Sequence, residues 1–224
     1  MLFRSPEELF IEQAIVRQNM LLATQAMVQR LPGRYRRGGW LPQFEPILAG
    51  GATLTNAPSL GQKLLMLLDG LQPAGITTLA LDQNNLLAML GATAEANSLL
   101  PVQVIDSGAL AYLATVISPV STVNYGTPIV RVKLIREDGT EMSSEVNMGN
   151  LQILPLDSGQ TARLELRPLQ RADVGLGPGR AGALDVIGSS LGVVIDARGR
   201  PLQLPSNAGE RVKLLRKWLK TVGG

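Results

Sequence analysis

Two glycine-rich segments contain the residues whose types and spacing best suit ligand binding in this chain. In the first, the apolar run at 46–49 ends at Gly50 and Gly51, and a helix is expected soon after. Glycine lets a ligand approach the bare backbone, and amide groups at a helix start carry partial positive charge. Gly50, Gly51 and Ala52 are therefore the predicted binding residues, and they form only half of a site without partners from elsewhere.

The second segment, DVGLGPGRAG at 173–182, has the glycine density of a phosphate-binding loop. No Lys-Ser or Lys-Thr pair follows it, a β segment comes next, and Pro178 lacks a backbone donor. It therefore fails the test for a P-loop, and we predict a tight connection between strands. A turn after residue 196 is expected to be pinned by an exposed pair between Asp196 and Arg198 or Arg200, which contributes at most about 1 kcal/mol.

Catalytic chemistry is limited by composition, because the chain has no cysteine and no histidine. This excludes thiol nucleophiles, Ser-His triads and nearly all zinc sites. Carboxylates remain, and six lie near the ends of expected elements: Asp69, Asp82, Asp106, Asp173, Asp185 and Asp196. Their spacing does not place two on one helix face, so we name no catalytic residue and no metal ligand. A carboxylate-based hydrolase remains an alternative that a buried, adjacent pair would support.

Length and charge favour a globular protein. The chain has 224 residues, of which 45% are apolar and 17% charged, enough to bury a large core. A formal charge of +3 and only 4% aromatic residues argue against a nucleic-acid partner. No segment resembles a signal peptide or approaches the roughly 20 apolar residues that span a bilayer. We expect a cytoplasmic protein without a membrane partner.

The first half of the chain alternates short apolar runs with helical periods, which predicts an α/β architecture. A helix over 5–29 begins with the capping box of Ser5 and Glu8. Strands are predicted at 47–49, 76–81 and 102–105, with helices over 58–71 and 84–94 and a short helix around Tyr112. The basic cluster at 34–37 is interpreted as a solvated loop, with a phosphate contact as the alternative.

After residue 119 the pattern becomes β-rich. Strands are predicted at 130–134, 141–146 and 161–167, with a hairpin turn at Asp138-Gly139 and a central strand at 191–195. A basic amphipathic helix over 207–222 closes the chain. We therefore predict three parts: an α/β lobe (1–118), a β-rich barrel or sandwich (119–205) and a C-terminal helix (206–224).

Several of these segments together resemble a known family. The glycine pair, the strand at 76–81 and the helix containing LGA at 90–92 resemble the adenosine-binding end of the superfamily of actin, sugar kinases and heat-shock chaperone ATPases. LQPAGIT at 71–77, LQILPL at 151–156, DVGLG at 173–177 and GVVIDARGRP at 192–201 resemble the closing portion of the glutamate mutase L (MutL) proteins. The resemblance covers about residues 7–219.

The resemblance implies a partial actin-like (ribonuclease H-like) lobe, with Gly50, Gly51 and Ala52 beside the adenine and ribose of ATP or ADP in a full-length relative. It also implies assistance to the assembly or reactivation of an adenosylcobalamin-dependent mutase. The phosphate-binding hairpins of such ATPases have no counterpart here, so we expect a noncatalytic C-terminal fragment or truncated relative. The alternative is a protein-interaction or self-assembly module that acts through the β domain or the basic helix, with a mutase subunit or a homo-oligomer as partner.

Overall fold

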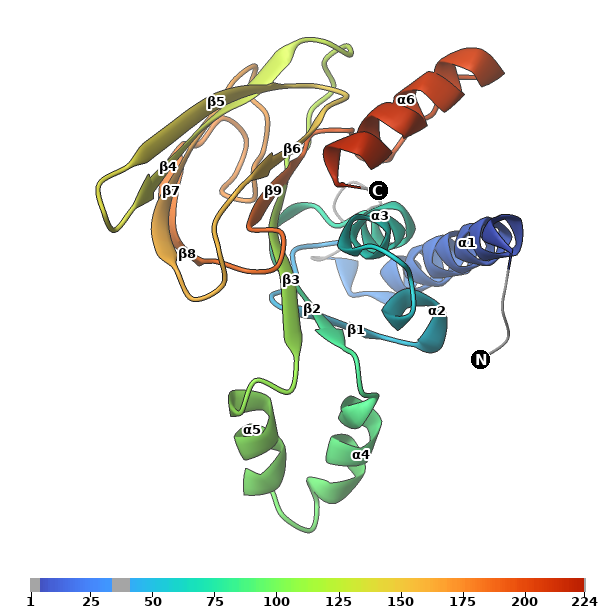
Figure 1. Ribbon diagram of the computed structural model, residues 1–224. Helices are drawn as coiled ribbons and strands as arrows, with labels where there is room; N and C mark the ends of the chain where they lie inside the picture. Colours follow the sequence, from blue (N-terminus) through green and yellow to red (C-terminus); the bar gives the residue numbers. More distant parts are fainter. Residues whose placement is uncertain (1–4, 34–40, 224) are drawn as a thin grey trace.

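The computed structural model describes residues 5–33 and 41–223, which form a mixed α/β structure with six helices and two sheets (Figure 1). The five-stranded sheet has the order β1-β2-β3-β9-β6 and the four-stranded sheet the order β5-β4-β7-β8. The first contains β1 (Ile47–Gly50), β2 (Gly75–Asp82), β3 (Ala111–Ser118), β9 (Val193–Asp196) and β6 (Leu151–Leu154). The second contains β5 (Glu141–Asn147), β4 (Pro128–Arg136), β7 (Thr161–Pro168) and β8 (Gly182–Ile187). Within the described residues the sheets form an open sandwich and not a closed barrel.

The five-stranded sheet combines strands from distant parts of the chain. β1 and β2 are parallel, β2 and β3 antiparallel, and β9 runs parallel to β3 and antiparallel to β6. The sheet thus contains strands from both sides of residue 119. The carboxyl ends of β1 and β2 lie at one end of this sheet, and the carboxyl ends of β3 and β9 lie at the other.

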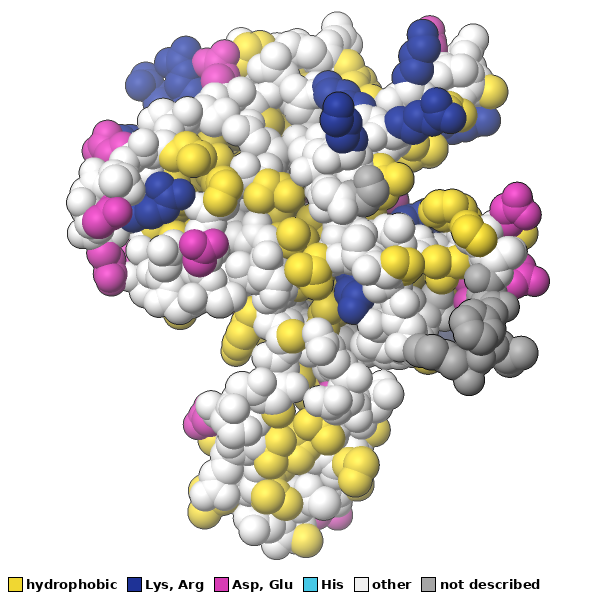
Figure 2. Space-filling model, viewed as in Figure 1, with side chains coloured by type: hydrophobic (Ala, Val, Ile, Leu, Met, Phe, Trp, Pro, Cys, Tyr) yellow, Lys and Arg dark blue, Asp and Glu magenta, His cyan; other side chains and the backbone are white. Residues whose placement is uncertain are grey.

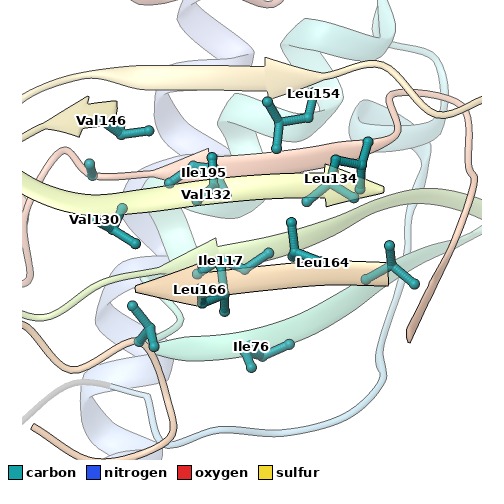
Figure 3. Close-up of a cluster of buried hydrophobic side chains, with 14 of the residues drawn as sticks. Ile76, Ile117, Val130, Val132, Leu134, Val146, Leu154, Leu164, Leu166 and Ile195 are labelled. Atoms are coloured by element: carbon teal, nitrogen blue, oxygen red, sulfur yellow. The ribbon is translucent and has the colours of Figure 1, made fainter. Parts of the chain in front are cut away.

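One hydrophobic core lies between the two sheets (Figure 3). Val130, Val132 and Leu134 of β4 point into it and are nearly inaccessible, as the predicted alternation requires. β7 contributes Leu164 and Leu166 in the same way. The predicted hairpin at Asp138-Gly139 and the central position of β9, whose four residues are all buried, are confirmed.

Helices cover the outer face of the five-stranded sheet, where α3 (Leu60–Leu71) and α6 (Ala208–Thr221) contribute to a second core. α1 (Pro6–Arg30) packs against α3 and begins at the predicted capping box of Ser5 and Glu8. α6 begins after Asn207, whose side chain accepts a hydrogen bond from the Glu210 N–H. The basic cluster at 34–37 lies outside the described residues. No helix within 5–33 and 41–223 is both long and apolar enough to cross a membrane.

A helical hairpin of α4 (Leu86–Thr93) and α5 (Leu99–Asp106) projects from the sheet between β2 and β3 (Figure 1). The predicted strand at 102–105 is wrong, because these residues belong to α5. The Asn97 side chain accepts hydrogen bonds from the N–H groups of Leu99 and Leu100 and so stabilises the start of the helix. The apolar run itself is short enough to fit either a helix or a strand. Tyr112 lies in β3 and not in a helix, so this prediction was also wrong.

Candidate functional site

The predicted binding residues lie together where the parallel pair β1 and β2 ends. Gly50 pairs with Asp82 across the two strands, and Gly51 has a φ of 114°, which only glycine adopts without strain. A Cβ on Gly51 would meet no atom within 4 Å, and one on Gly50 would lie 3.6 Å from the Asp82 Cβ. The backbone of both exposed glycines is thus open to a flat ligand.

The helix that follows this glycine pair is shorter than the sequence suggests. α2 (Ala52–Thr55) is a single turn, and the longer helix predicted from residue 58 begins only at Leu60. Gly51 offers no side-chain cap, and its carbonyl oxygen accepts hydrogen bonds from the N–H and the hydroxyl of Thr55. Because one turn carries a small dipole, the attraction for an anion is weaker here than at a long helix.

The nearest carboxylate to the glycine pair is occupied as a helix cap. Asp82 is almost fully buried, and its Oδ1 and Oδ2 accept hydrogen bonds from the N–H groups of Leu86 (2.8 Å) and Leu87 (2.9 Å). Asn85, whose Oδ1 lies 3.8 Å from a Cβ built on Gly50, adopts the left-handed conformation just before α4. The surroundings of the glycine pair therefore offer the Asn85 amide and backbone groups. Both can form hydrogen bonds with the hydroxyls and ring nitrogens of a ligand.

The second glycine segment joins β7 to β8, as the sequence predicts. Asp173 Oδ1 accepts hydrogen bonds from the N–H groups of Gly175 (2.8 Å) and Gly177 (3.0 Å). A Cβ on Gly175 would lie 2.9 Å from the Cα of Gly75, so the loop packs directly on the start of β2. These contacts indicate a structural role for the segment, because the N–H groups of Gly175 and Gly177 are already bonded to Asp173 and are not free to bind a phosphate.

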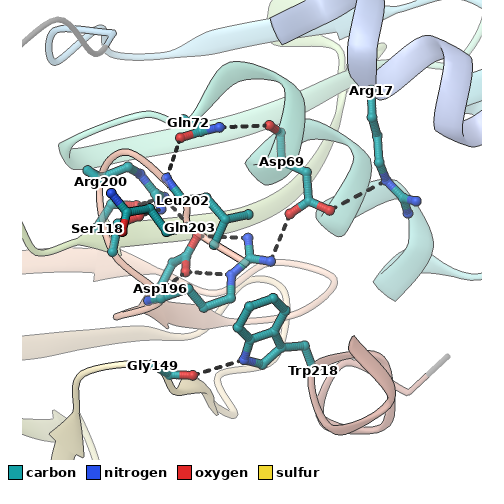
Figure 4. Close-up of polar contacts among 12 residues, drawn as sticks. Arg17, Asp69, Gln72, Ser118, Gly149, Asp196, Arg200, Leu202, Gln203 and Trp218 are labelled. Carbon is teal, nitrogen blue, oxygen red and sulfur yellow. Dashed lines mark hydrogen bonds and ion pairs between the residues drawn. The ribbon is translucent and has the colours of Figure 1, made fainter. Parts of the chain in front are cut away.

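The predicted pairing of Asp196 with Arg198 or Arg200 is confirmed for both arginines (Figure 4), but its expected exposure is wrong, because all three side chains are buried. Asp196 accepts two hydrogen bonds from the Arg198 guanidinium, at 2.8 and 3.1 Å, and one from Arg200 at 2.7 Å. Arg200 also donates to the Ser118 hydroxyl and to the Pro73 carbonyl. Sequence spacing shows that these charges are neighbours but does not show that α3 and α6 cover them.

Three helices extend this buried network. Arg198 donates to Asp69 of α3 at 2.7 Å, and Asp69 lies 3.5 Å from the Nε of Arg17 in α1. The indole ring of Trp218 in α6 lies 4.8 Å from the Arg198 guanidinium carbon and donates to the Gly149 carbonyl at 2.9 Å. Asp69 and Trp218 were not predicted as partners of Arg198. The lone tryptophan on an otherwise aliphatic helix face was the only local signal of such a contact.

The charges of the network stabilise one another. Burial by itself raises the pKa of Asp196, but the charges and hydrogen bonds of Arg198 and Arg200 outweigh it and hold the pKa well below its usual range. Burial lowers the pKa of Arg198, and the nearby Asp196 and Asp69 reverse this, so its pKa is raised. Asp196 and Arg198 therefore stay charged near neutral pH. The network holds the ends of β3 and β9 to α3 and α6.

Four of the six carboxylates are engaged in structural contacts. Asp82 and Asp173 cap backbone groups, and Asp69 and Asp196 are ion-paired. No group of three or more Asp or Glu side chains that could hold a metal ion is found within 5–33 and 41–223. The glycine end of β1 is the candidate site, and the groups that it offers suit ligand binding.

Searches against protein-family models, curated proteins and solved structures gave no match.

Proposed function

We propose that this chain is a noncatalytic C-terminal part of a glutamate mutase L-like protein of the actin-like ATPase superfamily. The observation that carries the proposal is the open glycine backbone at the end of parallel β1 and β2. Gly50, Gly51 and Ala52 would lie beside the adenine and ribose of ATP or ADP, as the sequence resemblance implies. The proposal includes the expected partial actin-like lobe and a cytoplasmic location.

The neighbouring groups support binding without hydrolysis. Phosphoryl transfer needs cations or metal ions that neutralise the charge of the transferring group. The carboxylate beside the glycine pair, Asp82, is already held by two backbone N–H groups of α4. We therefore assign the chain a supporting role, in the assembly or reactivation of an adenosylcobalamin-dependent mutase.

Isothermal titration with ATP and ADP tests this proposal. We expect weak binding of both nucleotides, because the backbone of Gly50 and Gly51 offers contacts to the nucleoside only. Gly50→Ala should abolish the binding, since its methyl group fits at 3.6 Å from Asp82 yet covers the backbone. Gly91→Ala on α4, where a Cβ meets nothing within 4 Å, is the matched control and should bind as the original chain does. Submillimolar affinity with hydrolysis would contradict a noncatalytic role, and identical binding by G50A would contradict the site.

A protein-interaction or self-assembly module is the second candidate, favoured by apolar side chains exposed on helices. α6 exposes Val212 and Leu215 between its lysines and arginines, and α1 exposes Ile11 and Ile15. Figure 2 shows dark blue basic side chains beside yellow apolar ones on α6, and more apolar surface on the α4–α5 hairpin. Exposed apolar side chains that gather on one surface are typical of interfaces.

Size-exclusion chromatography with light scattering tests the second candidate. We expect self-association, or binding of a mutase subunit, that Val212→Glu weakens because it places a charge in the apolar surface. Lys213→Glu on the same helix is the control, since it changes charge without removing apolar area. A monomer at every concentration that also binds no mutase subunit would contradict this candidate.

A further inference from the structure

A hollow of about 420 Å³ lies beside β8, on the sandwich side of β2 and β3. Its lining includes every residue from 184 to 189, together with Ile76 and Thr78 of β2 and Thr115 of β3. A hollow on the face of a strand is lined by alternate residues, because successive side chains point to opposite faces. Lining by consecutive residues instead places this hollow along the edge of β8.

β8 is the last strand of its sheet. Its hydrogen bonds to β7 show which of its residues point toward β7 and which point outward from the edge. The Gly188 N–H donates to the Gln160 carbonyl at 2.7 Å, in continuous register with the pairs of β7 and β8. Since bonded and non-bonded pairs alternate in an antiparallel ladder, the backbone groups of Ala183, Asp185 and Ile187 point away from β7. These three residues offer a row of donors and acceptors to a further strand.

The opposite wall of the hollow is a part of the five-stranded sheet that the four-stranded sheet leaves uncovered. Thr78 pairs with Thr115 there, and Leu48 of β1, which lies opposite Ala80 on the same face as Thr78, is 41% exposed. Ile187 at the end of β8 is 68% exposed. A strand added to β8 would cover this wall and the free backbone. It would also flank Ile187, whose side chain lies on the outer face of the sheet because Val186 packs into the core.

Charge identifies the occupant. Two carboxylates, those of Glu45 and Asp185, line the hollow, and no Lys or Arg does so in the described part of the chain. If two copies of this chain paired through β8 with the three outward residues in symmetric register, Asp185 would face its own mate. Like charges directly opposite destabilise a strand pair, so the edge disfavours a second copy and favours a basic segment.

We propose that β8 binds an extended segment of a partner protein as an added strand, with Lys or Arg on that segment beside Glu45 and Asp185. Main-chain hydrogen bonds to the outward groups of β8 supply affinity, and apolar side chains of the segment enter the hollow. This is the physical basis of β-strand addition. The inference is independent of nucleotide binding at Gly50 and Gly51, which lie on a different part of the sheet.

Selection from a displayed library of random octapeptides on the purified chain tests the proposal. We expect enriched peptides with Lys or Arg between apolar residues, and few with Asp or Glu. Asp185→Lys should weaken an enriched peptide about tenfold or more, through charge repulsion. Glu95→Lys, in the loop between α4 and α5, is the matched control and should leave the affinity unchanged.

A second variant separates backbone pairing from charge. Ile187→Pro removes an N–H that points outward and leaves the bonds to β7 intact, so the fold is retained and binding is lost. Bound peptide should slow amide hydrogen exchange at Ala183, Asp185 and Ile187. The proposal is overturned if no peptide is enriched, if acidic peptides prevail, if a folded Ile187→Pro chain binds normally, or if protection appears elsewhere.

Discussion

Asp82 and Asp196 are two buried aspartates at opposite ends of the five-stranded sheet, and their charges are compensated in different ways. Asp196 is enclosed by the guanidinium groups of Arg198 and Arg200, whereas Asp82 accepts two backbone N–H groups at the start of α4. The first arrangement ties β9 to elements far apart in sequence. The second orders only the helical hairpin next to it and leaves the adjacent glycine backbone open. One end of the sheet is thus locked by buried ion pairs, and the other keeps an exposed glycine backbone.

The largest expected effect comes from Asp196→Asn. The substitution keeps the size of the side chain but leaves two buried arginines without their central anion, and breaking a buried pair in this way costs about 3–5 kcal/mol. Urea denaturation followed by circular dichroism measures the loss of unfolding free energy. Asp106→Asn at the exposed end of α5 is the control and should change stability by less than about 0.5 kcal/mol. A similar small loss for both variants would show that the network is not a structural lock.

Acid should reproduce part of this effect. The pKa of Asp196 is lower in the folded chain than in the unfolded one, where it is about 4. Its stabilising contribution is therefore present above about pH 4 and is lost as the pH falls toward the folded value. Between about pH 5 and pH 2 the original chain should lose about 2–3 kcal/mol more stability than the Asp196→Asn variant. Parallel pH profiles for the two chains would mean that Asp196 does not carry this dependence.

Trp218→Phe tests how the tail helix seals the same end of the sheet. Phenylalanine keeps an aromatic ring but cannot donate to Gly149, and it makes a weaker cation–π contact with Arg198. With the buried carbonyl left unpaired, we expect a loss of about 2 kcal/mol in unfolding free energy. Combining this change with Asp196→Asn should cost less than the sum of the two, because both act on Arg198. Full additivity would place Trp218 outside the network.

The two ends also differ in how far the sequence could predict them. Patterns formed by near neighbours, such as the Ser5 and Glu8 capping box and the Asp138-Gly139 hairpin, were predicted because the residues that define them lie a few positions apart. The end of the sheet that holds Asp196 depends on a contact between Asp69 and Arg198. These two residues are 129 positions apart, and no local pattern encodes their contact. The sequence therefore showed the charges after β9 but assigned them to an exposed turn.

At the end of the sheet that holds Gly50 and Gly51, the position of the glycines was predicted correctly. The neighbouring helices and strands were predicted less well. Gly50 and Gly51 stand at a strand end as expected, since a glycine pair after an apolar run is a local signal. The apolar run at 102–105 was predicted to be a strand because a short apolar run fits both the strand period and the helix period. The Asn97 side chain caps the first turn of α5 and so favours the helix. The division between strand and helix here thus depended on one side chain outside the run.

Asp82→Asn gives the smallest effect and is the matched partner of Asp196→Asn. An asparagine side chain retains one oxygen for the α4 cap and loses the second acceptor, so we expect a cost of about 1 kcal/mol. The change should be local: amide hydrogen exchange should accelerate in α4 and α5 while β9 stays protected, because the hairpin makes few contacts with the rest of the chain. If Asp82→Asn destabilised the whole molecule as much as Asp196→Asn, both ends of the sheet would be structural locks. The end that holds Gly50 and Gly51 would then no longer differ from the end that holds Asp196.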